Sequence, residues 1–380
     1  MKILLLGEYN SSHYTLKEGL QELGHQVTVV GNGDGFKARK VDIKLNLRYV
    51  DGVSFYVKRL LYKLFKIDLT SIAIKKQFNR FKHVFKDYDI VQLINESPFK
   101  ANPKIEKQLL EFIFNNNKNV FLLSCGTDYS SVKYANDGYF RYSILDPYKE
   151  NRGTKKEFWH ALMYLTPEYI KLHKYIFKNI KGVIASDLDY DIPLRNHPKY
   201  LGLVPNPINI TKLNYIDLDV KDEIVIFHGI NRKNYYKKGN DIFEKALNII
   251  ASKYAEKIKI ITVESLPYHD YIKSFDSAHI VLDQVFAYDQ GFNALEAMAK
   301  GKVVFTGAEK EWLSLYNIKE DTIAINALPD ANAIAKKLEW LILNPLKIKE
   351  ISKNAHEFIL KEHHYIDCSK KYLETWLQAF

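Results

Sequence analysis

Cysteine is scarce in this sequence of 380 residues. The chain has two cysteines, Cys125 and Cys368. Two are too few for a disulfide framework, and neither stands in a spacing typical of metal ligands. We therefore expect a protein of a reducing compartment, where disulfides are rare.

Long apolar runs are also missing. The opening stretch MKILLLGEYN is apolar for only a few residues before Gly7 and Glu8, which is too short for the core of a signal peptide. No stretch approaches the roughly 18 apolar residues of a membrane span. The sequence also lacks short repeats and low-complexity tracts. We expect a cytoplasmic protein that does not cross a membrane.

The glycine fingerprint of dinucleotide-binding proteins is absent. The turn after the first apolar strand reads GEYNSS, where a nicotinamide-binding fold needs G-x-G-x-x-G so that the backbone can approach a pyrophosphate. This disfavours a dehydrogenase, and we expect no bound cofactor.

Apolar residues and positive charge are plentiful. With 380 residues, 47% of them hydrophobic, the chain exceeds the roughly 250–300 residues that one core supports, so we expect two domains. The net charge of +10 favours an anionic partner, which could be a nucleotide, a nucleic acid or an acidic lipid surface. An A- and T-rich genome would produce the same excess of lysine.

The first half alternates strands and helices. KILLLG predicts a strand, TLKEGLQELGH a helix capped by Thr15 and Glu18 and ended by Gly24, and QVTVVG a second strand. Strand, helix and strand within about thirty residues form a parallel βαβ unit. Further strands are predicted at DIVQLI, NVFLLS, GVIAS and YLGLVPNP, with a helix near Pro103 to Phe114. This pattern predicts a doubly wound α/β domain.

The second half repeats the pattern after a break. Residues 206–222 are rich in Pro, Asn and Asp and poor in periodicity. Strands follow at DEIVIFHG, KIKIITV, HIVLDQ, KVVFTG and DTIAIN, with helices between them. We expect two Rossmann-like domains, 1–205 and 206–362, facing a cleft, and a C-terminal helix in 363–380 that packs back on the first domain. Ligands of such sheets bind outside the carboxyl ends of the strands.

Two strand ends of the second half carry candidate ligand-binding residues. In HGINRKNYYKKG, Arg232 and Lys238 flank a loop that opens a helix, which supplies the ingredients of a phosphate site. In DQGFNALEAMAKG, Glu296 lies early in an otherwise apolar helix that begins after Gly291. A carboxylate removed from water needs a partner, and two ribose hydroxyls would provide one. A favourable charge near a helix N-terminus is the simpler explanation.

Together these stretches resemble the second domain of GT-B glycosyltransferases, in particular the retaining family 4. The resemblance rests on the element from Arg232 to Lys238, on PYHDYIKSFDSAHIVLDQ and on GFNALEAMAKGKVV, and it covers residues 200–320 well. It implies transfer of a sugar from a nucleotide-sugar to a glycan or lipid-linked glycan acceptor in cell-surface polysaccharide synthesis. It also implies that Arg232 and Lys238 hold the donor diphosphate and that Glu296 holds the ribose.

The chain departs from that family at its paired glutamates. The first glutamate of the family lies eight residues before the second, and this chain has Tyr288 there. The loop that contacts the donor sugar is therefore remodelled. We expect Asp283 and Gln284, or Asp289, to supply some of the sugar contacts. The other residues expected to bind the donor are Gly229, Gly291, Phe292 and Asn293.

The first domain should complete the active site. His13 follows the first strand and Asp128 follows NVFLLS, so both are expected at strand ends that face the cleft, as catalytic residues. A surface or capping role is the commoner one for a loop histidine. The retaining reaction of the family needs no enzyme nucleophile, and we expect neither a metal ion nor an Asp-x-Asp pair to hold one.

One basic stretch, VKRLLYKLFKIDLTSIAIKKQFNRFKHVFKD, contains two amphipathic helices. They could rest on an anionic membrane at its inner face and meet a lipid-linked acceptor, or pack on their own sheet with solvated lysines. Three other functions stay open for the chain as a whole. They are a GT-B sugar epimerase, an inactive partner-binding relative and, with less support because no recognised module appears, a nucleic-acid-binding protein.

Overall fold

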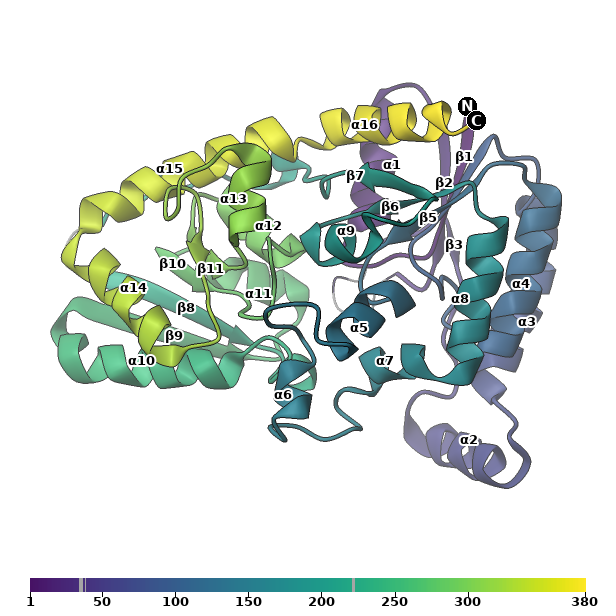
Figure 1. Ribbon diagram of the computed structural model, residues 1–380, viewed down its shortest axis with the longest axis horizontal. Coiled ribbons are helices and arrows are strands. Elements are labelled where there is room, and N and C mark those ends of the chain that lie inside the picture. Colours follow the sequence, from purple (N-terminus) through teal and green to yellow (C-terminus); the bar gives the residue numbers. More distant parts are fainter. Residues whose placement is uncertain (34–36, 38, 221–222) are drawn as a thin grey trace.

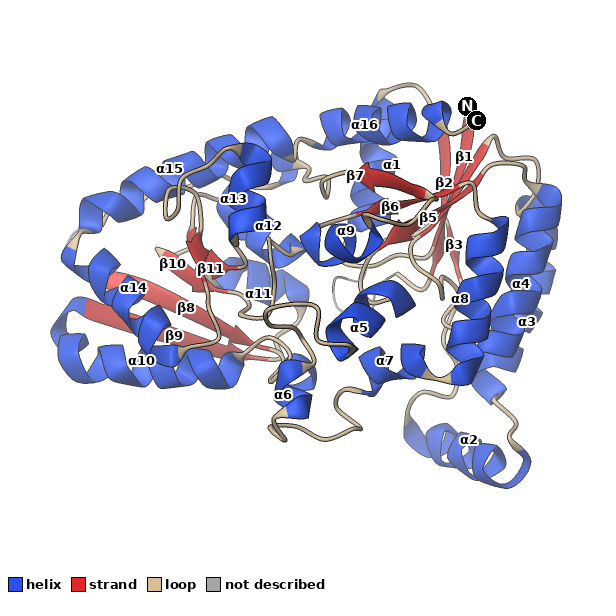
Figure 2. Cartoon of the chain, viewed as in Figure 1, coloured by secondary structure: helices blue, strands red, loops and turns tan. Residues whose placement is uncertain are grey.

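Two parallel β-sheets, each with helices packed around it, make up the molecule (Figure 1). The structure is a computed structural model, and it describes residues 1–33, 37, 39–220 and 223–380. Figure 2 shows strands enclosed by helices in both halves. The predicted α/β class with two Rossmann-like domains is confirmed.

The first sheet has seven strands in the order β3-β2-β1-β4-β5-β6-β7, and its neighbouring strands are parallel. The strands are β1 (Lys2–Leu6), β2 (Gln26–Gly31), β3 (Ile43–Lys44), β4 (Ile90–Leu93), β5 (Val120–Ser124), β6 (Gly182–Ala185) and β7 (Tyr200–Leu203). The helices of this half are α1 (Ser12–Glu22), α2 (Gly52–Phe65), α3 (Leu69–Arg80), α4 (Pro103–Asn116), α5 (Tyr129–Asn136), α6 (Asp146–Lys149), α7 (Trp159–Leu162), α8 (Pro167–Asn179) and α9 (Leu188–Leu194).

Successive residues of β1 supply the cores on the two faces of this sheet. Ile3 and Leu5 point into a core shared with α1 and with Trp376. Leu4 and Leu6 point into a core shared with α3, α4 and α8. Alternate side chains of a strand point to opposite faces, so a fully apolar strand is what a sheet covered on both sides requires.

The second sheet has five parallel strands in the order β12-β11-β10-β8-β9. The strands are β8 (Ile224–Ile230), β9 (Ile258–Glu264), β10 (Ile280–Leu282), β11 (Val303–Thr306) and β12 (Ile325–Asn326). The helices are α10 (Asn240–Tyr254), α11 (Tyr268–Ser274), α12 (Phe292–Ala299), α13 (Lys310–Tyr316), α14 (Ala331–Leu343) and α15 (Pro345–Glu362). One apolar core extends across this half.

The chain passes between the halves twice, and the two passages touch. The backbone N–H of Ile208 donates to the carbonyl of His363 at 2.7 Å, and the His363 ring contacts the carbonyl of Asn206 at 2.9 Å. Helix α16 (Tyr365–Gln378) then returns to the first sheet, where Trp376 is buried beside Phe121. Figure 1 shows this yellow helix running along the top of the first half, with both termini together.

The predicted start of the first helix is wrong. Thr15 and Glu18 do not form a capping box, because α1 begins at Ser12 and both residues lie inside it. The predicted end is confirmed: Gly24 has a φ of 83°, and its N–H donates to the carbonyl of Gln21.

The two predicted amphipathic helices have different environments. Helix α3 buries Ile74 and Phe78 in the core of the first sheet, and the turn after it buries Phe85. Helix α2 buries none of its residues, all of which the structure describes. Packing on the sheet therefore explains the apolar stripe of α3 but not that of α2.

Candidate active site

A cavity of about 730 Å³ lies between the carboxyl ends of the two sheets. The loops after β1, β5 and β6 line it from the first half, and the loops after β8, β9 and β10 line it from the second. This is the predicted position, because parallel strands present their carboxyl ends and the following loops at the same edge.

Lysines form the cavity wall after β8. Lys233, Lys237 and Lys238 line it, and the Lys238 ammonium lies 2.8 Å from Oδ1 of Asp283. Burial, assisted by the neighbouring Lys238 charge, lowers the pKa of Lys237 to about 8. Sequence analysis passed over Lys233 and Lys237, which lie in the same KNYYKKG loop. The wall suits an anionic group of a ligand.

Gly239 allows this wall to approach the loop after β10. Its φ is 74°, and a Cβ at this position would come within 2.6 Å of the Val285 side chain. A side chain there would strain the backbone and displace Val285. Glycine thus places Lys238 beside Asp283.

Arg232 is next to Lys233 in the chain, but its side chain does not take part in the cavity wall. Its guanidinium pairs through two nitrogens with the carboxylate of Glu264, in an exposed position, and Arg232 does not line the cavity. The expectation that Arg232 and Lys238 flank one ligand is therefore not met in this structure, because Glu264 at the end of β9 holds the arginine at the surface.

Glu296 has protein partners, and it is buried. Its Oε2 lies 2.9 Å from the Lys37 ammonium, its Oε1 accepts from the Tyr268 hydroxyl at 2.9 Å, and Arg39 lies 3.5 Å away. Glu296 is the fifth residue of α12, beyond the first turn, so a favourable helix dipole does not explain it. It does not line the cavity. A ribose would have to share or replace these partners.

The remaining residues predicted to contact the donor all line the cavity: Gly229, Asp283, Gln284, Asp289, Gly291, Phe292 and Asn293. Two of them carry buried oxygens with no hydrogen-bond partner among the described residues, namely Oδ2 of Asp283 and Oδ1 of Asn293. Buried polar atoms are almost always paired in folded proteins, so unpaired ones in a cavity wall point to a ligand or to water.

His13 does not reach the cavity. Its ring is fully buried, with Nδ1 donating to the Gly7 carbonyl at 2.8 Å and Nε2 accepting from Gln92 at 3.1 Å. Burial lowers the pKa of His13 to about 4, against the opposing effect of the Gly7 carbonyl. The side-chain oxygen Oε1 of Gln92 in turn accepts from the Trp376 indole N–H. Through Gln92, His13 thus connects the end of β1 to the returning helix α16. Its role in this structure is structural, which corrects the expectation that His13 is catalytic.

Asp128 does not line the cavity either. It is the N-cap of α5, where its carboxylate accepts from the backbone N–H of Ser131 at 2.8 Å and from the hydroxyl of Ser124. A capping aspartate satisfies helix N–H groups that have no partner inside the helix. The position predicted as catalytic therefore serves the start of a helix.

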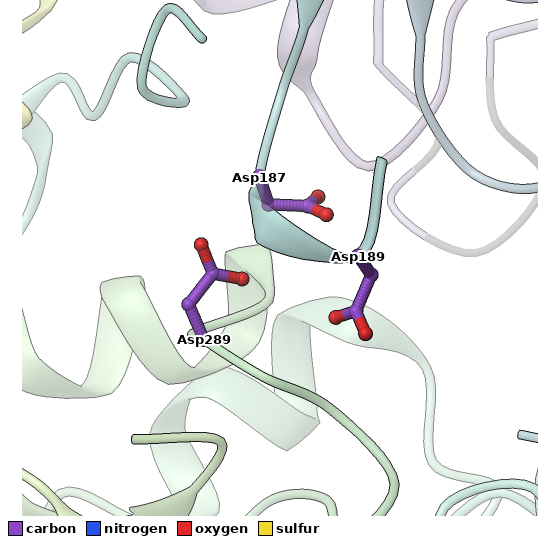
Figure 3. Close-up of side chains that lie close together, drawn as sticks. All are labelled: Asp187, Asp189 and Asp289. Carbon is purple, nitrogen blue, oxygen red and sulfur yellow. The ribbon is translucent and has the colours of Figure 1, made fainter. Parts of the chain in front are cut away.

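Three carboxylates meet where the two halves adjoin (Figure 3). Asp187 and Asp189 follow β6 and Asp289 follows β10, and each has an oxygen within 4.8 Å of the others. Burial raises the pKa of Asp189 to about 7, and burial with the neighbouring carboxylates raises that of Asp289. Asp289 and Asp189 also accept from the backbone N–H groups of Leu188 and Tyr288 across the seam.

Sequence analysis missed this cluster. Asp187 and Asp189 form an Asp-x-Asp pair, so the expectation that no such pair is present is wrong. The three oxygens are close enough to hold a cation, or to share protons when none is bound. The pair was visible in the sequence, but its nearness to Asp289 was not.

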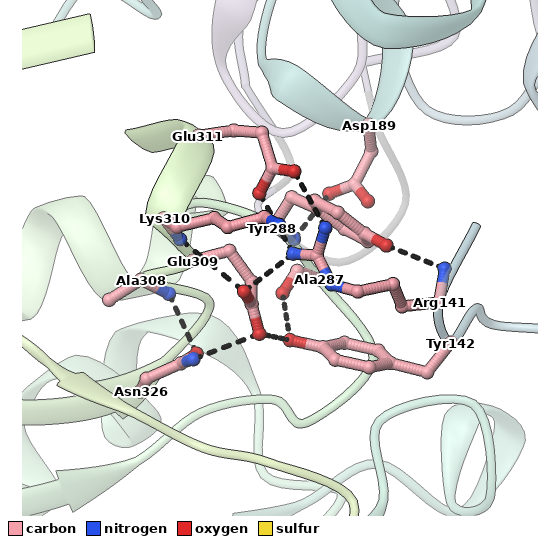
Figure 4. Close-up of polar contacts among 10 residues, drawn as sticks. All are labelled: Arg141, Tyr142, Asp189, Ala287, Tyr288, Ala308, Glu309, Lys310, Glu311 and Asn326. Carbon is pink, nitrogen blue, oxygen red and sulfur yellow. Dashed lines mark hydrogen bonds and ion pairs between the residues drawn. The ribbon is translucent and has the colours of Figure 1, made fainter. Parts of the chain in front are cut away.

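A polar network joins the halves beside the cavity (Figure 4). The Arg141 guanidinium contacts Glu309 and Glu311, each at 2.6 Å, and the Tyr142 hydroxyl donates to Glu309 at 2.7 Å. The Tyr288 hydroxyl accepts from the Arg141 backbone N–H at 2.8 Å. The position where the resemblance expects a first glutamate is thus occupied by a tyrosine that contacts the opposite domain.

Comparison with known proteins agrees with this architecture. Residues 232–374 match a family model described as glycosyl transferase-like. Among solved structures, the chain is similar to sucrose-phosphate synthase from Thermosynechococcus elongatus, with 15% identity and a TM-score of 0.63 over 100% of this chain and 99% of that one. No curated protein matches the chain.

Two further structures are similar over nearly their whole length. HepE from Anabaena, in complex with UDP and glucose, has 12% identity and a TM-score of 0.60 over 100% of both chains. A putative UDP-N-acetylglucosamine 2-epimerase from Listeria monocytogenes has 12% identity and a TM-score of 0.54 over 98% of this chain and 94% of that one. The chain therefore has the GT-B fold, and its residues 232–374 match the glycosyl transferase-like family model.

Proposed function

We propose that the protein is a glycosyltransferase that moves a sugar from a nucleoside diphosphate sugar to a hydroxyl of a glycan or lipid-linked glycan. The observation that carries the proposal is the cavity between the domains, whose second-domain wall presents lysines beside unpaired polar oxygens. Cations suit a diphosphate, and oxygens such as Oδ1 of Asn293 and Oδ2 of Asp283 suit sugar hydroxyls. The family region at 232–374 includes this wall.

We propose that the donor is a sugar linked to uridine diphosphate. The Anabaena HepE structure contains UDP and glucose, and the Listeria structure is described as a putative epimerase of a UDP-sugar. The chain has the same fold as both. Glu296 is the residue proposed to accept from the ribose, because its carboxylate has acceptor capacity beyond the hydrogen bonds from Lys37 and Tyr268.

The proposed reaction retains the configuration of the transferred sugar and uses no metal ion or other cofactor. As the bond to the sugar breaks, negative charge builds on the leaving diphosphate, and Lys238 and Lys237 lie where they can stabilise it. The acceptor hydroxyl attacks the sugar from the same face and gives its proton to the leaving diphosphate oxygen. The metal-independent form predicts that a chelator leaves activity unchanged, whereas activity restored only by a divalent cation would assign that role to Asp187, Asp189 and Asp289.

A sugar epimerase is the second candidate, and one observation favours it. Asp189 has a pKa of about 7 in the cavity wall, so near neutral pH it can both accept and donate a proton, which epimerisation at a carbon centre requires. The two activities differ in their products. An epimerase returns an altered sugar still linked to the nucleotide, and a transferase releases the nucleoside diphosphate when an acceptor is present.

A thermal-shift screen against UDP, GDP, dTDP and CMP forms of sugars tests the donor class. Stabilisation by a UDP-sugar with slow release of UDP supports the proposal, and product analysis separates transfer from epimerisation. Binding without any turnover would identify an inactive relative. Retention on DNA that depends on salt, without nucleotide-sugar binding, would instead support a nucleic-acid partner.

The Glu296→Gln variant tests the ribose contact. A neutral amide replaces a charge-assisted acceptor, and charge-assisted hydrogen bonds are roughly twice as strong as neutral ones. Compared with the unaltered protein, the variant should bind UDP more weakly. It should bind 2′,3′-dideoxy-UDP as tightly as the unaltered protein does, because that nucleotide lacks the two ribose hydroxyls. An equal loss for both nucleotides would show that Glu296 acts through the fold rather than through the ribose, since its partner Lys37 is buried with it.

A further inference from the structure

Helix α2 turns its apolar side away from the protein. Val53, Val57, Leu60 and Leu64 recur at spacings of four, three and four residues, which places them on one stripe of the helix. Their exposed fractions are 80%, 47%, 57% and 61%. A helix that packs on its own domain turns such a stripe inward, as α3 does with Ile74 and Phe78.

A neighbouring side of α2 is the one nearer the protein body. Ser54, Phe55, Lys58 and Leu61 are half-buried, and they lie roughly a third of a turn around the helix from the exposed stripe. The helix is therefore oriented with its more apolar side outward. Figure 1 shows α2 standing below α3, apart from both sheets.

The charge of this segment has one sign. Between Gly52 and Ile67 the sequence holds four cations, Lys58, Arg59, Lys63 and Lys66, and no acidic residue. Arg59, Lys63 and Lys66 are exposed. A helix with an outward apolar stripe and flanking cations has the composition of one that lies in the interface of an anionic bilayer.

The position of α2 also relates it to the cavity. Helix α2 follows β3, the outer strand of the first sheet, and all strands of that sheet are parallel. The end of β3 therefore lies at the same sheet edge as the ends of β1, β5 and β6, whose following loops line the cavity. The loop that leads to α2 therefore leaves the sheet at the edge that also carries the cavity.

We propose that α2 docks the protein on an anionic lipid surface, with Val53, Val57, Leu60 and Leu64 inserted among the acyl chains and Arg59, Lys63 and Lys66 at the headgroups. The occupant is a lipid surface rather than a second copy of the chain, because a second copy would place its own Arg59, Lys63 and Lys66 against the same three cations across the contact. The proposal stands apart from the proposed function, since its test needs no sugar transfer.

Vesicle sedimentation of the full chain tests the proposal. Phosphatidylglycerol-containing vesicles should bind the protein at low salt at least about tenfold more tightly than phosphatidylcholine vesicles, and about 0.5 M salt should weaken the binding. Leu60→Ser with Leu64→Ser should release the protein. The matched control is Leu343→Ser with Leu346→Ser, which changes two exposed leucines of the second domain and should bind as the unaltered chain does.

Charge reversal and a fluorescent label complete the test. Arg59→Glu with Lys63→Glu should abolish binding, and Lys336→Glu with Lys349→Glu, on exposed positions of α14 and α15, should not. A polarity-sensitive label on Leu64→Cys should report an apolar environment with anionic vesicles. The same labelling reaction on the unaltered chain measures any label taken up by Cys125, which lines the cavity, and by buried Cys368.

Three results would overturn the proposal. They are binding that ignores lipid charge, equal loss of binding in the test and control variants, and a vesicle-independent dimer that the Leu60→Ser and Leu64→Ser changes dissolve. The last result would assign the apolar stripe to a second copy of the chain.

Discussion

The pair between Lys238 and Asp283 allows a sharp test of the proposed diphosphate contact, because its two members are buried to different degrees. The Asp283 side chain is 3% exposed and that of Lys238 is 22% exposed, with 2.8 Å between the charged atoms. Oδ2 of Asp283 has no partner among the described residues. Removing the lysine therefore leaves a buried carboxylate without its cation, whereas removing the carboxylate leaves an ammonium that can reach water.

Opposite effects on UDP affinity are expected from the two single variants. Lys238→Met should destabilise the fold by about 3 kcal/mol and weaken UDP binding by about 2 kcal/mol or more, which is roughly 30-fold. Asp283→Asn should strengthen UDP binding several-fold. It frees the ammonium, and it removes a like charge that, at ~8 Å and an effective dielectric constant of about 20, opposes the diphosphate by about 2 kcal/mol.

The double variant separates stability from binding. Lys238→Met with Asp283→Asn should recover much of the stability that Lys238→Met loses, since no buried charge is left unpaired, but it should not recover UDP affinity. Calorimetric titration with UDP and denaturant unfolding measure the two quantities. UDP serves better than a UDP-sugar because Asp283 is itself a predicted sugar contact. If both single variants weakened UDP binding equally, the pair would be a structural unit and Lys238 would not be the diphosphate contact.

Three further predictions concern stability. Arg141→Met should lower the free energy of unfolding by about 1–3 kcal/mol, measured by denaturant unfolding. This is less than the loss expected for a fully buried ion pair, because the arginine side chain is 40% exposed, and Glu311→Gln should lower it by less than Arg141→Met does. The unfolding midpoint should fall as the pH rises from about 4 to about 7, because burial raises the pKa of Asp189 and the fold therefore favours its protonated form. Asp189→Asn should flatten this dependence, and a midpoint that rises with pH would contradict it. His13→Ala should lower stability by about 1–3 kcal/mol and leave UDP affinity within a factor of about two, whereas a selective loss of turnover would return His13 to the active site.

The strands and the cavity position could be predicted from the sequence because both depend on local patterns. Short apolar runs such as KILLLG have no polar face, so they fit only sheets covered on both sides. The topology then places the ends of all parallel strands at one edge. The sequence therefore predicts that Asp283, Gly291 and Asn293 lie at the cleft, and all three line the cavity.

The partners of individual side chains could not be predicted, because they come from distant parts of the chain. Lys37 and Glu296 are 259 residues apart, and Asp187 and Asp289 are separated by the whole β8 to β10 region. Arg232 has the position of a ligand-binding cation in the sequence, which does not show that Glu264 ends the neighbouring strand opposite Ile230, within reach of the Arg232 guanidinium. The sequence predicts where a loop lies, but it does not predict the direction in which a side chain of that loop points.

Glu296 shows that charged residues near this site are paired within the protein. A carboxylate buried in an apolar helix does have a partner, as its chemistry demands, but the partner in this structure is Lys37 and not a ligand. The same holds for Lys238, whose partner is Asp283. Nucleotide binding at these two residues would then exchange one set of charge partners for another, so its affinity would reflect the difference between two pairings rather than the full strength of either. Variants that remove the internal partner therefore inform on the ligand contact more directly than variants that remove the contact itself.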